Sequence, residues 1–379
     1  VEDVKEFFRI YYAPNNAVQE EKRLTYDNRP YANAFLRLHE MTFKNPANAH
    51  STIGSMEDLD AATIEDIQEF FRIYYAPNNA VLTIVGDFDP AEARSLVERY
   101  FGTIPSQPLP PSVDVSEPPE VAQKAETYKD PFAQLPALMM SWKIPARRTP
   151  EYYALQLASD LLFEGDSSRL YQKMVKDEES VVAIQGGVDE RRGPSSIYIF
   201  AIPKPDRTME AIRESISREV ERLAAEGPSA AEMEKLHNNL LNDAVRSRQS
   251  SLYRAQMLAE YALYDDDPTL VNTELERFYA VTAEQIKTTV ARFLIGDNKV
   301  TVEIIPAPHS ADESADESAP LSASAQISTE PTPPGEPPPQ IPSRPTLEPA
   351  SPTEPIEAIP TGGAAEPPPE ERPQASDQS

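Results

Sequence analysis

The residues of this chain that could do chemistry are few in kind. It has no cysteine, which excludes thiolate chemistry and disulfides. Its four histidines are scattered, at His39, His50, His237 and His309. No two of them lie four residues apart on a predicted helix, as two imidazole zinc ligands on one helix face would require. We therefore interpret each histidine as a surface or packing residue.

Three clusters of acidic or hydroxyl residues remain as candidates for metal binding or catalysis. Glu20 and Glu21 lie on a charged, helical segment, where the residues alone indicate a solvated carboxylate at Glu21 and a differently facing one at Glu20. The run Ser167 to Arg169 has no neighbouring histidine and no strained Gly-x-Ser-x-Gly turn that would activate a serine. The run Asp265 to Asp267 lacks the spaced ligands and the glycine of a calcium loop, so we interpret it as a solvated helix end.

The stretch from Ile64 to Pro90 organises the first part of the chain. It predicts a helix with Thr63 as its cap, a turn at Ala76–Asn79 and a strand over Ala80–Val85. A second helix follows from Asp89 and ends at Gly102, with Ala93, Leu96, Val97 and Tyr100 predicted to face inward.

The beginning of the chain repeats this stretch. Val1–Val18 matches Ile64–Val81 almost letter for letter, but the first copy then continues into charged helix instead of strand. Structural repeats normally keep their fold while their letters drift. We therefore interpret residues 1–18 as a recent partial duplication or a faulty splice of the gene model, with a designed repeat as the alternative.

Composition restricts the partners. The formal net charge of -27 argues against nucleic acid, because phosphate binding needs a basic face. Peptide or protein substrates remain, and the acidic body favours basic peptides. No run of about 18 apolar residues predicts a membrane span. The absence of cysteine does not decide the compartment, and a tail suited to spacing through an envelope slightly favours a periplasmic or cell-envelope location.

The C-terminal segment Ala307–Ser379 is rich in Pro, Glu and Ser and holds about half of the 39 prolines. It cannot bury enough apolar surface to offset its chain entropy, roughly 1–2 kcal/mol per residue. We predict a disordered tail that acts as a solubiliser or spacer, with recognition by a proline-binding partner as the alternative.

The remaining body divides into a partial first domain over 19–104, a Pro-rich linker over 105–120 and a complete second domain over 121–306. One helix interrupted near Asn28–Tyr31 opens the first domain, with Ala34, Phe35, Leu38 and Met41 as its buried stripe. The order of elements in the second domain predicts an α+β fold with an antiparallel sheet packed against helices. Its predicted elements are strands 137–143, 181–188, 195–202 and 300–305 and helices 151–162, 168–176, 209–226, 230–248, 249–263, 269–278 and 283–293.

Several short motifs, in this order, resemble the pitrilysin/insulinase superfamily of zinc metallopeptidases, which includes the mitochondrial processing peptidase. The resemblance extends from Gln19 to Pro306, and no single motif would carry it. The motifs are Glu20-Glu21-Lys22-Arg23 with Asp27-Asn28-Arg29-Pro30-Tyr31, Ile53-Gly54-Ser55, Tyr74-Tyr75-Ala76-Pro77-Asn78-Asn79-Ala80, Val85-Gly86-Asp87, Tyr100-Phe101-Gly102 and Ser168-Arg169-Leu170-Tyr171.

The resemblance implies zinc-dependent peptide-bond hydrolysis in a chamber of repeated α+β domains. Its members take two zinc ligands and a general base from an inverted His-x-x-Glu-His motif, and a third ligand from a downstream Glu. Glu21 matches that downstream ligand, but this chain has no His-x-x-Glu-His. Where the family's ligand helix continues upstream with another acidic residue, Pro14 stands here and would end the helix.

A second departure lies in the predicted second domain. Some members carry an Arg and a Tyr, seven residues apart, that hold the substrate, and Val175 and Val182 occupy the matching positions. Neither can donate a hydrogen bond, so the resemblance implies a homologous partner subunit. We therefore predict a zinc-metalloendopeptidase family member that is inactive alone. The alternatives are a non-catalytic, peptide-binding partner of an active homologue and a purely structural protein.

Overall fold

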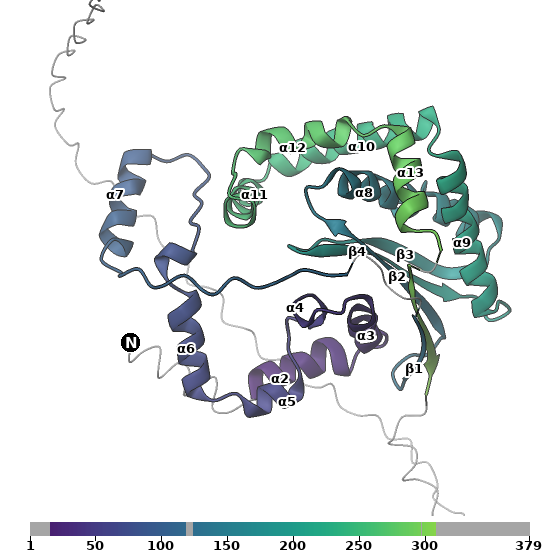
Figure 1. The fold of residues 1–379 in the computed structure, drawn as a ribbon, viewed down its shortest axis with the longest axis horizontal. Coiled ribbons are helices and arrows are strands. Elements are labelled where there is room, and N and C mark those ends of the chain that lie inside the picture. Colours follow the sequence, from purple (N-terminus) through teal and green to yellow (C-terminus); the bar gives the residue numbers. More distant parts are fainter. Residues whose placement is uncertain (1–15, 119–123, 297, 308–379) are drawn as a thin grey trace, which may run out of the picture. The chain divides into compact units, whose positions relative to one another are not determined.

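The structure is a computed structural model that describes residues 16–118, 124–296 and 298–307 (Figure 1). The first 15 residues of the predicted duplicate lie outside this range, and so does the predicted tail apart from Ala307. All described residues belong to one compact unit.

Five strands form one sheet in the order β1-β5-β2-β4-β3. The α+β class is confirmed, and three of the four strand pairings are antiparallel as predicted. The fourth pairs β1 with β5 in parallel, so the sheet is mixed. The sequence did not predict β1. The strands are β1 (Lys124–Asp130), β2 (Ala137–Ala146), β3 (Val181–Asp189), β4 (Pro194–Pro203) and β5 (Val300–Pro306).

The central strand β2 is apolar along both faces because both faces of the sheet are covered. Leu138, Met140 and Trp142 belong to the core under one helix layer, and Ala137 and Met139 to the core on the opposite face. One strand thus joins two hydrophobic cores.

The larger helix layer covers the first of these faces (Figure 1). Its helices agree with the predicted ones within two residues, because hydroxyl N-caps and periodic apolar positions mark them locally. Thr208 and Ser229, for example, cap α9 and α10 through their side-chain oxygens. The helices are α8 (Pro150–Phe163), α9 (Met209–Glu226), α10 (Ala230–Arg248), α11 (Ser251–Tyr264), α12 (Leu270–Tyr279) and α13 (Ala283–Phe293). The predicted helix 168–176 is largely a π-helical turn, η3 (Tyr171–Asp177).

The opposite face of the sheet is covered by α3 (Ala32–Thr42), a helix of the predicted first domain (Figure 1). The predicted stripe is confirmed: Ala34, Leu38 and Met41 are buried against the sheet, and Phe35 is partly buried there. The left-handed residue Tyr31 begins the helix, and its N–H donates to Asp130 Oδ2 at 2.6 Å. The two predicted domains therefore share one core.

The other described elements of the first domain are all helical. These elements are α2 (Asn16–Lys22), η1 (Arg23–Asp27), α4 (Pro46–Ala49), α5 (Met56–Ala61), α6 (Ile64–Tyr74), η2 (Pro77–Asn79) and α7 (Pro90–Phe101). Thr63 caps α6 as predicted, in a capping box with Asp66, and Asp89 caps α7.

The predicted strand over Ala80–Val85 is wrong. A strand needs a ladder partner, and no described residue pairs with this segment, so Leu82 is 60% exposed despite its apolar neighbours. The inward stripe predicted for α7 is confirmed only in part: Ala93 and Val97 are half-buried, whereas Leu96 and Tyr100 are exposed. The described residues therefore cover these two apolar segments incompletely.

His39 joins α3 to the β3–β4 hairpin. Its Nε2 lies 3.5 Å from Asp189 Oδ2, and its Nδ1 lies 3.1 Å from the Arg191 guanidinium. Arg191 in turn donates to the Asn48 carbonyl and lies over the Phe43 ring, 4.8 Å from its centroid. Burial lowers the pKa of His39; the Asp189 charge opposes this shift and the Arg191 charge adds to it. Nδ1 of the neutral ring can therefore accept from Arg191.

We expect this junction to make stability depend on pH. The folded state holds His39 neutral, whereas in the unfolded chain this histidine has a pKa of about 6.5. As the pH falls below that value, the unfolded chain takes up a proton that the folded chain does not, and the free energy of unfolding decreases. In His39→Gln, the slope of unfolding free energy against pH between about 7 and 5 should be shallower than in the wild type. Urea titrations at several pH values measure it. His50→Gln, at an exposed histidine, is the control; equal slopes in all three proteins would contradict the assignment.

Candidate functional site

The structure places Glu21 on α2 with an exposed side chain. No hydrogen bond or ion pair joins its carboxylate to another described residue, whereas the neighbouring Glu20 pairs with Arg23. Across the described residues, no group of three or more His, Asp or Glu side chains is placed to hold a metal ion. The residues around Glu21 thus do not by themselves fit a zinc ion.

The histidines do not come together at Glu21. His39 is held by the β3–β4 hairpin, and His50 follows α4 at the surface. His237, on α10, lies with its ring 4.9 Å from the ring of Tyr279. His309 lies outside the described residues.

The two valines at the family's Arg and Tyr positions lie in different surroundings. Val175, in η3, packs against the larger core, and Val182, on β3, is 55% exposed. Neither side chain can polarise a substrate carbonyl. In the described part of the chain, these two positions therefore supply no hydrogen-bond donor for catalysis.

The motif Ser168–Tyr171 has a structural role. Ser168 and Leu170 are buried, and Arg169 reaches the turn between α9 and α10, where it donates to both oxygens of Glu232 and to the carbonyl of Gly227. The Arg169 hydrogen bonds lower the pKa of Glu232 to about 2. This resemblance motif therefore stabilises the helix layer.

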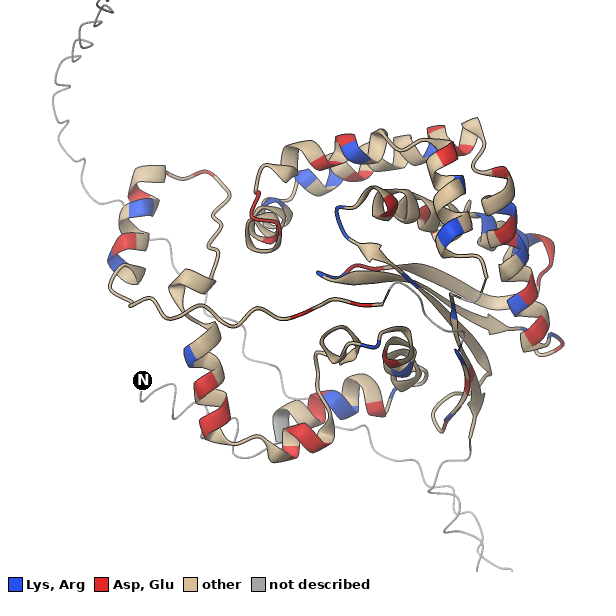
Figure 2. Ribbon diagram, viewed as in Figure 1, with Lys and Arg blue, Asp and Glu red and all other residues tan. Residues whose placement is uncertain are grey.

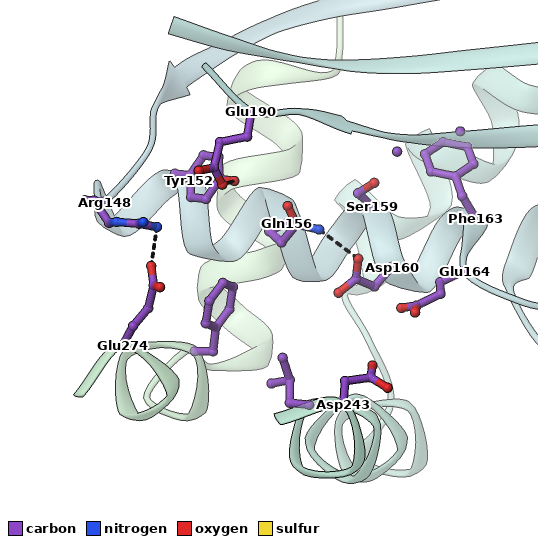
Figure 3. Close-up of a pocket in the computed structure, with 14 residues that line it drawn as sticks. Arg148, Tyr152, Gln156, Ser159, Asp160, Phe163, Glu164, Glu190, Asp243 and Glu274 are labelled. Atoms are coloured by element: carbon purple, nitrogen blue, oxygen red, sulfur yellow. Dashed lines mark hydrogen bonds and ion pairs between the residues drawn. The ribbon is translucent and has the colours of Figure 1, made fainter. Parts of the chain in front are cut away.

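A polar cleft of about 480 Å³ opens between α8, β3, α10 and α12 (Figure 3). One end is electrically balanced. There Arg148 donates to Glu274, and the Tyr152 hydroxyl donates to Glu190. Burial, followed by the Glu190 charge, raises the pKa of Tyr152, so its hydroxyl keeps its proton.

The other end of the cleft is acidic and unbalanced. Asp160 and Glu164 come from α8, and Asp243 faces them from α10 (Figure 3). Burial, and then the charges of Glu164 and Asp243, raise the pKa of Asp160 to about 7, although it accepts a 3.0 Å hydrogen bond from Gln156. Burial, with the Asp243 charge, also raises the pKa of Glu164.

The sheet side of the cleft is formed by Gly186 and Gly187 on β3. Both glycines pair regularly with β4, and the register shift between the two strands lies between Val181 and Ala183. A Cβ on Gly186 would lie 2.6 Å from the Tyr198 carbonyl oxygen and 2.9 Å from the Phe163 ring. Close packing requires glycine at position 186.

The sequence did not predict this cleft. Asp160 and Asp243 lie far apart in the chain, on helices whose polar faces look like any solvated face. The one local signal was the glycine pair inside a strand, which indicates close approach of another group.

Charge elsewhere in the described chain does not mark a second site. Acidic and basic side chains are interspersed along the helices (Figure 2). No helix of the described residues is long and apolar enough to cross a membrane.

Comparison with known proteins finds similarity to zinc peptidases. A family model described as "Peptidase M16 inactive domain" matches residues 61–240. A zinc protease from Helicobacter pylori, PqqE, is 28% identical over 253 residues, which are 66% of this chain and 56% of PqqE. The chain thus spans little more than half of that relative.

Solved structures show the same fold. A protease from Helicobacter pylori superposes with a TM-score of 0.72 at 23% identity, covering 77% of this chain and 70% of that one. A peptidase M16 inactive domain from Pseudomonas fluorescens gives 0.68 at 18% identity, covering 77% and 69%. Residues 61–240 thus match the peptidase M16 inactive domain, and the rest of the described chain shares the fold of these peptidases.

Proposed function

We propose that this chain acts in proteolysis as the non-catalytic, peptide-binding part of an insulinase-type zinc peptidase and does not cleave peptide bonds by itself. The observation that carries the proposal is the combination of an inactive-domain match with an exposed Glu21 that has no second metal ligand among the described residues. Hydrolysis of this type needs three protein ligands for one zinc ion.

Two further observations support the proposal. The relative PqqE is named a zinc protease, and the valines at positions 175 and 182 leave substrate polarisation to another group. Glu21 matches a zinc ligand only through the resemblance, and one exposed carboxylate does not hold a zinc ion by itself. A homologous subunit is the partner that the proposal requires.

The full-length chain tests the proposal directly. We expect less than stoichiometric zinc after dialysis against zinc and removal of the free metal, measured by mass spectrometry. A fluorogenic peptide should remain uncut, while fluorescence anisotropy should show saturable binding of a labelled peptide.

Two outcomes would contradict the proposal. Stoichiometric zinc with chelator-sensitive cleavage would make the chain an active enzyme, and a folded chain that binds no peptide would have no part in substrate binding. Glu21→Gln is the matched variant: because the carboxylate is exposed and unpaired among the described residues, it should change neither stability nor peptide binding.

A further inference from the structure

The acidic end of the cleft has no cation of its own. The nearest arginine lining the cleft, Arg148, is at the opposite end, where Glu274 and Asp265 hold it. Lys235 lowers the pKa of Glu164 only in part, and its ammonium donates instead to the Ser167 carbonyl at 3.2 Å. The half-buried Asp160 and the exposed Glu164 and Asp243 therefore gather at this end of the cleft, and the Lys235 charge compensates them only in part.

A buried hydroxyl at the same place also lacks a partner. Ser159 lines the cleft and is only 2% exposed. No side-chain hydrogen bond joins Ser159 to another described residue, but its oxygen is not among the fully buried atoms that lack a partner, so it is open to the cleft. Figure 3 shows this oxygen pointing away from the helix axis, on the side of β3. The hydroxyl is therefore available to a polar group of a ligand in the cleft.

The shape of the site selects among cations. The carboxyl groups are not arranged to hold a metal ion, whereas an ammonium or guanidinium group carries several spread donors. Phe163, Leu240 and Phe278 add apolar walls, against which the methylene stem of a long basic side chain would pack. The volume of about 480 Å³ lies within the range of ligand pockets, roughly 300–1,000 Å³.

We propose that this cleft binds a lysine or arginine side chain of a peptide, whose cationic head lies between Asp160 and Asp243 and whose donors reach the Ser159 hydroxyl. The proposal rests on the proposed function, because it names the kind of peptide that the chain selects.

The test uses the full chain and labelled peptides that differ at one central residue: lysine, arginine or the uncharged norleucine. At pH 8 we expect the lysine and arginine peptides to bind about 10-fold more tightly than the norleucine peptide, as anisotropy measures it. Asp160→Asn and Asp243→Asn should each remove most of this preference. Glu221→Gln removes one exposed charge on α9, outside the cleft, and should leave the preference unchanged.

Binding should also depend on pH. The groups facing Asp160 are Gln156 on its own helix, Glu164 just after that helix and Asp243 on α10, while Glu190, just after β3, and Glu274 on α12 line the same cleft. A bound cation favours ionised Asp160, so the affinity for the lysine peptide should rise between pH 6 and 8 with release of a proton. Calorimetry in buffers of different ionisation enthalpy measures that proton, which Asp160→Asn should abolish.

Folding of the variant is checked separately. Because the pKa of Asp160 is raised to about 7, ionising this group costs the folded chain stability as the pH rises from the ordinary pKa of an Asp to 7. Asp160→Asn should therefore be at least as stable as the wild type at pH 8, and lost binding cannot then be attributed to unfolding.

The outcomes separate the two proposals. Equal affinity for all three peptides would overturn the cleft assignment and leave peptide binding intact, whereas no binding of any peptide would overturn the proposed function. If spermidine displaces the lysine peptide and binds more tightly than it, the cleft is a site for free polyamines, which contradicts the peptide assignment.

Discussion

Arg169→Met is expected to destabilise the chain by about 1.5–3 kcal/mol, the usual range for hydrogen bonds to a charged group, because the Arg169 side chain is largely buried and its partner Glu232 is partly exposed. The Arg169 side chain is 9% exposed and pairs with Glu232 through two hydrogen bonds. Glu219, 5% exposed, lies 3.8 Å from the same guanidinium. Methionine fills the space of the arginine stem but leaves two carboxylates at the α9–α10 turn without this cation.

The pH dependence of the unfolding free energy identifies Glu232 as the partner of Arg169. Because Arg169 lowers the pKa of Glu232 to about 2, the stabilisation is present above the ordinary value of about 4.5 and is lost as the pH falls towards 2. The difference in unfolding free energy between the wild type and Arg169→Met should shrink over that window. Urea unfolding at several pH values measures it.

Two variants serve as controls for Arg169. Arg218→Met removes an exposed arginine that pairs along its own helix with Glu214, and should change stability by less than about 1 kcal/mol. Arg169→Met with Glu232→Gln should be less destabilised than Arg169→Met alone. If Arg169→Met and Arg218→Met cost the same, the motif has no structural role.

The helices of the second domain could be predicted because their signals are local. Thr208 and Ser229 mark helix starts whatever surrounds them, and α9 and α10 have the predicted bounds. Strands are different, since a strand exists only with its partner. Ala80–Val85 has the composition of a strand but no ladder among the described residues. Lys124–Asp130 has a polar composition and is a strand because β5 pairs with it.

The candidate sites show the same limit. Glu21 could be named only through a resemblance, because one exposed carboxylate has no local signal of metal binding. The cleft brings Asp160 and Asp243 together from separate helices, and the pKa of Asp160 rises mainly through burial, with the charges of Glu164 and Asp243 adding to the shift. Contacts between distant segments create this chemistry, and no periodicity within either helix predicts them.

A second ion pair, between Glu117 and Lys143, anchors the segment after α3 to the sheet. The exposed fractions of the two side chains are 1% and 3%, and Lys143 Nζ lies 3.3 Å from Glu117 Oε2. The same carboxylate accepts hydrogen bonds from the N–H groups of Lys44 and Asn45 and from the Asn48 side chain. Burial alone would raise the pKa of Glu117, but these donors and the Lys143 charge hold it below its ordinary value.

Glu117→Ala should therefore cost about 3–5 kcal/mol, because it leaves the Lys143 ammonium buried without a partner and three donors without an acceptor. Urea unfolding gives the loss, and hydrogen exchange should show faster opening at residues 44–48 than at β2. Asp114→Asn, at a nearby exposed carboxylate, should leave stability close to that of the wild type.

The double variant Glu117→Gln with Lys143→Met separates charge from anchoring. Glutamine still offers one oxygen to the Lys44 and Asn45 N–H groups, and methionine removes the buried ammonium, so this variant should be more stable than Glu117→Ala. If it is as unstable, the cost is due to lost packing and not to an unpaired charge. If Glu117→Ala behaves like Asp114→Asn, the segment between α3 and α4 is not anchored through Glu117.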